Sequence, residues 1–160
     1  MSFLINTFLG KIISTFFISM VPVIELRGAI PIGTGMGLSL WLAIFVSIIG
    51  NMVPVPFIIV FIRKIFEWMR KKLPKLDGLV SKLEARADKH KETVLKYEFW
   101  GLFLLVAIPL PGTGAWTGAL VAAMMDMRLK KAVPAIFLGV VTAGIVVAFA
   151  TSGIMAWLNF

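Results

Sequence analysis

Two oppositely charged residues, Glu25 and Arg27, stand alone in an apolar stretch of the sequence. A charged side chain at bilayer depth costs about 2.5–3.5 kcal/mol on insertion scales, so such residues are functional candidates. Arg27 could bind an anion through two parallel hydrogen bonds. Apolar neighbours and the guanidinium act on the pKa of Glu25 in opposite directions, so its carboxyl group could exchange a proton. We predict Arg27 as a substrate ligand and Glu25 as the proton-coupling group. A pair that only neutralises itself and pins the chain is the alternative.

A second candidate site is the uncharged motif Pro-Leu-Pro-Gly-Thr-Gly-Ala-Trp-Thr-Gly at residues 109–118. A helix starting near Gly114 would point free N–H groups and the positive end of its dipole at this motif, and one starting near Gly28 would do so at the first. With a guanidinium beside them, these groups favour an anion such as phosphate. A structural turn is the alternative. The predicted substrate-binding residues are Arg27, Gly28, Asn51, Gly112, Thr113, Gly114, Trp116 and Thr117.

Asn51 and Thr142 lie halfway along two long apolar segments, residues 38–62 and 132–152. At mid-helix they would be level with the two motifs and could line the same cavity. Trp116 could cover the apolar part of an amphiphilic substrate. For Asn51, a simple hydrogen bond between helices is an equally good interpretation.

The composition indicates that lipid surrounds most of the chain. Apolar residues make up 59% and charged residues 15% of 160 residues, against about 45–50% and about 25% in soluble domains. With no Cys and one His, we expect no disulfide, no metal site and no cofactor. A single His and one acid in the two motifs also argue against an enzyme, which would need a Ser–His pair, two acids or metal ligands at depth. Basic residues without interleaved aromatics argue against nucleic-acid binding.

The charges are concentrated in residues 63–98, which hold 11 of the 16 basic and 6 of the 8 acidic residues. Basic residues beside hydrophobic segments are typical of the cytoplasmic flank of a membrane protein. We therefore predict a single membrane domain, 1–160, with a first repeat at about 1–62, a cytoplasmic helical linker at 63–98, and a second repeat at about 99–160.

Within each repeat, the segment before the long helix is too broken to span a bilayer. The apolar runs 12–21 and 99–108 are followed by Pro and Gly, and ten helical residues rise only about 15 Å, half of a hydrocarbon core of about 30 Å. Each segment is therefore predicted to form a re-entrant hairpin, which enters the membrane and returns on the same side. A plain bundle of four to six kinked spanning helices is the alternative.

Charge placement orients these elements. Arg128, Lys130 and Lys131 follow the second hairpin, so it should open to the cytoplasm, and the first should open outside. Both termini are then predicted outside, with residues 2–10 as a candidate interfacial helix. The result is an all-α integral membrane protein built as an inverted repeat, the plan of many secondary transporters.

The linker is predicted to be helical on both sides of Pro74. Beyond it, apolar residues recur at helical spacing and form an amphipathic stripe. This stripe could pack on the membrane domain or form the seam of a homodimer. The stripe consists of Leu76, Val80, Leu83, Ala87, His90, Val94 and Tyr97.

Three segments together resemble the small multidrug export family of bacteria and archaea: residues 25–31, Gly50-Asn51 and residues 109–118. More distantly, they resemble the DedA-like superfamily of membrane proteins with paired re-entrant hairpins. The family name implies drug export, and the DedA-like resemblance implies proton-coupled movement of phosphate-headed lipids such as polyprenyl phosphate. The acidic and arginine positions of DedA-like proteins match only Glu25 and Arg27, and the second hairpin has no arginine.

The function predicted from these observations is a prokaryotic plasma-membrane transporter or flippase for an anionic amphiphile. Its partner would be a membrane lipid or a small amphiphilic substrate, bound between the two hairpin tips. A proton-coupled exporter of cationic drugs and a structural membrane protein without transport are the alternatives. Arg27 beside Glu25 argues against a cation site.

Overall fold

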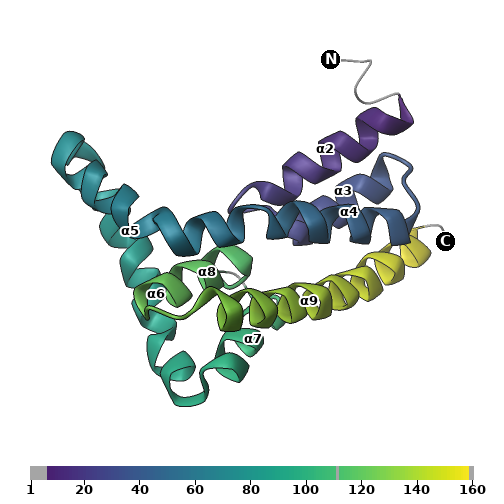
Figure 1. Ribbon diagram of the computed structural model, residues 1–160. Coiled ribbons are helices and arrows are strands. Elements are labelled where there is room, and N and C mark those ends of the chain that lie inside the picture. The colour runs from purple at the N-terminus through teal and green to yellow at the C-terminus, as the bar shows by residue number, and fades with distance from the viewer. Residues whose placement is uncertain (1–6, 111, 159–160) are drawn as a thin grey trace. The chain divides into compact units, whose positions relative to one another are not determined.

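The computed structural model describes residues 7–110 and 112–158, and their regular secondary structure is helical. The all-α class predicted from the sequence is therefore confirmed. Figure 1 shows the elements in chain order. They are α2 (Phe8–Met20), α3 (Glu25–Gly35), α4 (Leu40–Met52), α5 (Pro54–Lys72), the 3-10 helix η1 (Pro74–Leu76), α6 (Asp77–Tyr97), α7 (Phe99–Ala107), α8 (Ala115–Met124) and α9 (Leu129–Leu158).

The chain divides into two compact units. The N-terminal unit comprises Met1–Val53 and Val140–Phe160, and the central unit comprises Pro54–Gly139. The boundaries fall between α4 and α5 and inside α9. The division of the chain into two repeats stays a prediction, as do the interfacial helix at 2–10, of which residues 2–6 lie outside the described residues, and the placement of the termini.

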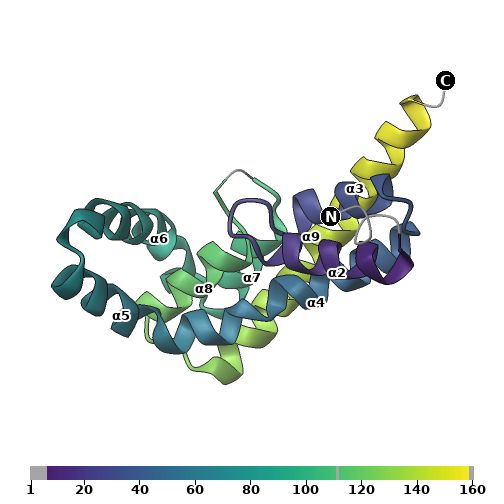
Figure 2. The same cartoon turned by 90° about the horizontal axis from the view of Figure 1, so that it is seen from above.

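In the N-terminal unit, helices α2, α3 and α4 pack against one another in all three pairs, and Figure 2 shows them side by side. Small residues allow this close packing. A Cβ placed on Gly33 would lie 2.9 Å from Oγ1 of Thr15 and 3.3 Å from Cβ of Ala43. One placed on Gly50 would lie 2.1 Å from Oγ of Ser19 and 2.5 Å from a backbone oxygen of α2. Close approach at small residues is typical of helix packing in membranes.

The C-terminal part of α9 belongs to the same unit and packs on α4. A Cβ on Gly144 would lie 3.6–3.7 Å from side-chain atoms of Ile44 and Ile48, which is ordinary van der Waals contact. The N-terminal unit is therefore a set of four helical segments joined by small-residue contacts.

In the central unit, α8 packs on α5, and the amphipathic helix α6 packs on α7 and α8. Val80 and Ala87 of α6 are fully buried, as the predicted stripe requires. A Cβ on Gly118 of α8 would lie 2.6 Å from Cγ2 of Val106, and one on Gly139 would lie 2.6 Å from Cβ of the same residue. Val80 and Ala87 therefore pack on helices of their own unit, whereas Leu76 and Tyr97 of the stripe are exposed, and the homodimer seam stays a prediction.

Helix lengths separate two kinds of apolar element. Two helical stretches are long and apolar enough to cross a membrane: Leu40–Lys72 and Leu129–Ile154. The first covers the predicted segment 38–62 except for residues 38 and 39, and the second contains the predicted segment 132–152. The helices α2, α3, α7 and α8 have 13, 11, 9 and 10 residues, so even α2 rises only about 20 Å. The predicted contrast between long and short apolar helices is confirmed.

The first break in the chain is shorter than the sequence suggests. The predicted break runs from Pro22 to a helix starting near Gly28, but only Val21–Ile24 separates α2 from α3, and α3 continues through Pro31 and Gly33. Pro31 lies six residues into α3, where tight packing on α2 and α4 holds the helix despite the proline. The segment 38–62 differs in the opposite way. It is predicted as one long helix, but it divides into α4 and α5 at Val53, just before Pro54.

Candidate functional site

Glu25 is the first residue of α3 and one of the most unusual positions in the described chain. Its side chain is buried, with 4% of the residue exposed, and its backbone has φ = +48°. A residue with a side chain pays strain of about 1–3 kcal/mol in such a conformation, and such strain clusters at functional sites. The Glu25 N–H donates a hydrogen bond to the Val21 oxygen at 2.9 Å, so the turn itself is well ordered.

Arg27 lies half-buried on the same helical turn, and its charge is attracted by Glu25. The carboxylate is thus buried inside the unit, and the guanidinium lies nearer its surface within range of the carboxylate's charge.

Arg27 opens onto a cavity of about 310 Å³ that lies wholly within the N-terminal unit. Its α3 side follows one helix face, with Arg27, Pro31, Thr34 and Gly35, and its other side is the C-terminal part of α9. The Thr34 hydroxyl donates to the backbone oxygens of Ile30 and Pro31 at 3.0 Å, so its hydrogen bonds are made within α3. The α9 residues are Val147, Ala150, Thr151 and Ile154. Arg27 is the one charged residue in this lining, and the walls are otherwise mostly apolar.

The sequence predicts free N–H donors near Gly28, and the structure corrects this prediction. Because α3 begins three residues earlier than predicted, the Gly28 N–H donates to the Ile24 oxygen at 3.0 Å. A Cβ on Gly28 would lie 2.4 Å from Cγ2 of Ile24. Gly28 therefore permits close packing of the turn, and its N–H is already used inside the helix.

The second predicted motif lies in the central unit, where α8 begins at Ala115 after Gly114, as predicted. Gly112 and Gly114 have φ of +89° and +133°, which favours glycine. The Thr113 hydroxyl donates to the oxygens of Ile108 and Leu110, at 2.8 and 2.9 Å. The Thr117 hydroxyl donates to the Gly112 oxygen at 3.0 Å. Both hydroxyls thus stabilise the loop, Trp116 is half-buried at the start of α8, and Pro111 lies outside the described residues.

Sequence reasoning missed a cation at this loop. Arg86, in the middle of α6, donates from Nε to the Gly112 oxygen at 3.2 Å. A Cβ on Gly112 would lie 2.8 Å from a terminal nitrogen of that guanidinium, so the arginine lies closely over the glycine. The signal was present in the stripe: Arg86 precedes buried Ala87, and the face around Ala87 is the one that packs on α7 and α8.

Asn51 is fully buried in α4 and does not line the Arg27 cavity. Its side-chain nitrogen and oxygen, and Oγ of buried Ser47 one turn earlier, have no hydrogen-bond partner among the described residues. Thr142, the predicted counterpart of Asn51, is half-buried in α9. Asn51 is thus a buried polar residue in a long apolar segment. The hydrogen bond between helices that the sequence offered as an alternative is not found among the described residues.

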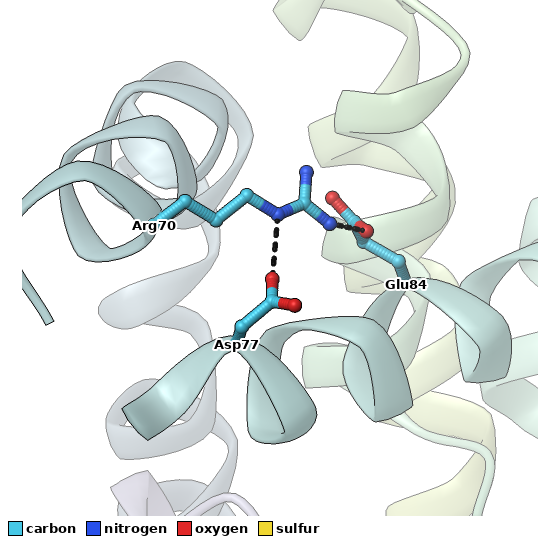
Figure 3. A network of polar contacts seen from close by, with 3 residues as sticks. All are labelled: Arg70, Asp77 and Glu84. Carbon is cyan, nitrogen blue, oxygen red and sulfur yellow. Dashed lines mark hydrogen bonds and ion pairs between the residues drawn. The ribbon is translucent and has the colours of Figure 1, made fainter. Parts of the chain in front are cut away.

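The charged ends of the central unit are held by ion pairs. Lys131 Nζ lies 3.0 Å from Oε2 of Glu98, and Arg63 pairs with Asp126. Arg70 of α5 bridges Asp77 and Glu84 of α6, as Figure 3 shows. Within the described residues, no group of three or more His, Cys, Asp or Glu side chains could hold a metal ion.

A family model described as "Putative small multi-drug export protein" matches residues 25–146. The match starts at Glu25, includes all the predicted site residues, and ends inside α9. Neither a curated protein nor a solved structure matches the chain. The more distant resemblance to DedA-like proteins stays a prediction. Because the match covers well over half of the 160 residues, the chain belongs to the small multi-drug export protein family.

Proposed function

We propose that the protein is a membrane transporter for an anionic amphiphile, whose head group binds Arg27 in the cavity between α3 and α9. The observation that carries this proposal is the composition of the cavity wall. One guanidinium faces a volume of about 310 Å³ whose other walls are apolar side chains, glycine and two threonines. Such a site offers a charge-assisted hydrogen bond to a head group and apolar contact to a tail. A phosphate-headed lipid, for example a polyprenyl phosphate, has this chemistry.

Export of a cationic drug is the second candidate, and the family description favours it. A cation would need a carboxylate in the binding site. Glu25 does not line the cavity, whereas Arg27 does. A cation in this cavity would therefore meet a like charge first, which supports the anionic substrate.

Glu25 is proposed as the proton-coupling group. It is buried next to the head-group ligand, so a change in its charge would change the field at Arg27. Protonation of Glu25 would leave the guanidinium uncompensated and strengthen anion binding. Deprotonation would restore the internal pair and favour release. Transport of the anion would thus follow the proton gradient.

The membrane topology proposed is two re-entrant hairpins of opposite orientation, α2–α3 and α7–α8. The ends of each hairpin lie together within its own unit. The Glu98–Lys131 ion pair joins the start of α7 to the start of α9. A Cβ on Gly37, after α3, would lie 3.3 Å from Nζ of Lys11, in the first part of α2. Short paired helices whose ends meet support entry and return on one side of a prokaryotic plasma membrane.

Substrate class is tested by direct binding to the purified protein. A fluorescent polyprenyl phosphate and tetraphenylphosphonium are titrated against wild type, Arg27→Ala and Arg27→Lys. Loss of a charge-assisted bond of about 1.5–3 kcal/mol should weaken phosphate-lipid binding roughly 10- to 150-fold in Arg27→Ala. Lys should restore part of it, because a point charge replaces a planar fork. Lys11→Ala, which removes the other lone cation of this unit, is the matched control and should bind normally. Tight binding of the phosphonium, strengthened by Arg27→Ala, with no binding of the lipid, would establish drug export instead.

Topology is tested on the same chain, since it has no native cysteine. Ser39→Cys, between α3 and α4, should react with a membrane-impermeant maleimide added outside the cell. Ser81→Cys, on the exposed side of α6, should react only after the membrane is opened. Labelling of both positions from one side would refute the opposite orientation of the hairpins.

A further inference from the structure

Ser47 and Asn51 form a buried polar pair in α4 that the proposed substrate site does not use. Both are fully buried, and neither the Ser47 hydroxyl nor the two Asn51 amide atoms has a hydrogen-bond partner among the described residues. One helical turn separates them, so they share a face. Buried polar atoms without partners cost free energy, and such positions call for an explanation in terms of a bound group or a function.

The register of the helices places this pair at the level of the tip of the first hairpin. Helices α3 and α4 are neighbours joined by a short turn and therefore antiparallel, and Gly33 lies against Ala43. Glu25 precedes Gly33 by eight residues and Asn51 follows Ala43 by eight, so the two are level along the helix axes. Gly50, the neighbour of Asn51 in the chain, lies against Ser19, one residue before the end of α2. This contact independently places Asn51 level with the end of α2, where the hairpin tip begins.

The chemistry of the unpartnered atoms selects the group that can bind. The Asn51 amide presents a donor and an acceptor, and the Ser47 hydroxyl can act as either. A metal cation would satisfy the oxygens but would leave the amide N–H groups without an acceptor. A water molecule accepts from the amide nitrogen and donates to an oxygen, and buried waters typically make about three hydrogen bonds.

We propose that Ser47 and Asn51 bind an internal water molecule that relays protons to and from Glu25. This inference rests on the proposed proton-coupled function and assigns the route by which the proton reaches the buried carboxyl group. In each transfer, the water gives one proton to the Glu25 carboxylate and takes one from the next water in the path, so it is unchanged. In residues 7–53 and 140–158, the other charged side chains are Arg27 and Lys11, and Lys11 lies at the opposite end of the hairpin near Gly37.

The water site is tested first without any substrate. Protein labelled with 15N at asparagine is reconstituted in lipid, and transfer of magnetisation from water to the Asn51 side-chain amide is measured by solid-state NMR. The signal is assigned by its loss in Asn51→Leu. We expect a water cross-peak that weakens in Ser47→Ala but not in Ser39→Ala, which removes an exposed serine at the start of the same helix. Absence of the cross-peak, or a shift of the amide signal on adding Na⁺ but not on changing pH, would overturn the proposal.

The relay is tested by transport and stability together. Asn51→Leu removes the hydrogen bonds to the proposed water and replaces the amide by an apolar side chain of similar size, so its Tm should stay close to that of wild type. Transport driven by a pH gradient should nevertheless fall roughly tenfold or more, by analogy with loss of a positioned proton-transfer group. Binding of polyprenyl phosphate at equilibrium should stay within about twofold of wild type, since a residue outside the cavity wall contributes no direct contact.

The outcomes separate the two proposals. Normal gradient-driven transport by Asn51→Leu refutes the relay but leaves the Arg27 site standing. A lower Tm with parallel loss of binding shows a structural role for Asn51 and also refutes the relay. Failure of wild-type protein to bind the phosphate lipid refutes the proposed substrate, while the water cross-peak still decides whether Asn51 is hydrated.

Discussion

The N-terminal and central units pack short helices against longer ones, but they keep their polar groups in different places. In the N-terminal unit, the buried polar and charged residues are Thr15, Ser19, Glu25, Thr34, Ser47, Asn51 and Thr151. In the described part of the central unit, Thr117 is the one such residue. The central unit instead carries its charges in exposed ion pairs, for example between Lys131 and Glu98.

This difference bears on the proposed site, which lies in the N-terminal unit. Exposed ion pairs contribute little to stability and tolerate change. Buried polar groups cost free energy unless something compensates them, so their concentration in the N-terminal unit is in keeping with the site proposed there. Four predictions test this contrast.

The largest effect is expected from a matched pair of substitutions, Glu25→Gln and Glu98→Gln. Both glutamates have positive φ, at 48° and 41°, but Glu25 is buried and the Glu98 side chain is 65% exposed. Glu25→Gln should reduce gradient-driven transport by roughly 100-fold or more, because a proton-transfer group is lost. Glu98→Gln should leave transport intact and cost less than about 1 kcal/mol of stability. Both are measured in liposomes with a pH-sensitive dye inside. Loss of folded Glu25→Gln protein from the membrane would favour a structural pin.

The second effect concerns the packing of α2 on α4. Gly50→Val should lower the free energy of unfolding by about 1–3 kcal/mol, because its Cβ would overlap Oγ of Ser19 and a backbone oxygen of Phe16. The matched control is Gly78→Ala in α6, where a Cβ meets nothing within 4 Å, and which should gain about 0.5–1 kcal/mol. Unfolding in detergent, followed by tryptophan fluorescence, measures both. Equal tolerance at the two glycines would contradict the close packing of the N-terminal unit.

A third, smaller effect is expected at the ion-pair network of Figure 3. The pKa of Arg70 is raised by its hydrogen bonds to Glu84 and Asp77. Because the Arg70 side chain is exposed to solvent, Arg70→Gln should lower Tm only slightly, and the difference from wild type should shrink in high salt. Transport should be unchanged. A salt-independent loss of stability would show that these charges hold the central unit together more firmly than exposed pairs do.

The smallest effect is a pH dependence at His90, the only histidine of the chain. Its pKa lies below the ordinary value, because partial burial disfavours the charged imidazolium and because Lys89 and Arg86 repel it. The unfolded chain therefore binds more protons near pH 6, so stability is present above the ordinary pKa of about 6.5 and is lost as pH falls through it. We expect a loss below about 1 kcal/mol, since the group is only partly buried and solvent screens its charged neighbours. His90→Gln should remove this slope, and an unchanged slope would assign it to another group.

The sequence by itself determined the features that depend on local chemistry. Runs of apolar residues interrupted by Pro and Gly give the short helices α2 and α7, and uninterrupted runs give the two long apolar stretches. Gly114 before α8 and the stripe around Val80 and Ala87 follow from the same local rules. Glu25 and Arg27 were recognisable because a charge in an apolar segment is conspicuous in any fold.

Only the tertiary structure decided what these residues contact. The Arg27 cavity joins α3 to Val147–Ile154, more than a hundred residues away, and no sequence spacing encodes that pairing. Arg86 reaches Gly112 because α6 packs along α7 and α8. The Gly28 N–H is used within the helix because packing extends α3 through a proline. Among the described residues, no hydrogen-bond partner reaches the buried Asn51 amide, which its sequence position alone does not show. Helix formation is a matter of neighbours in sequence, whereas burial, pairing and cavity walls depend on residues that only the packing of distant segments brings together.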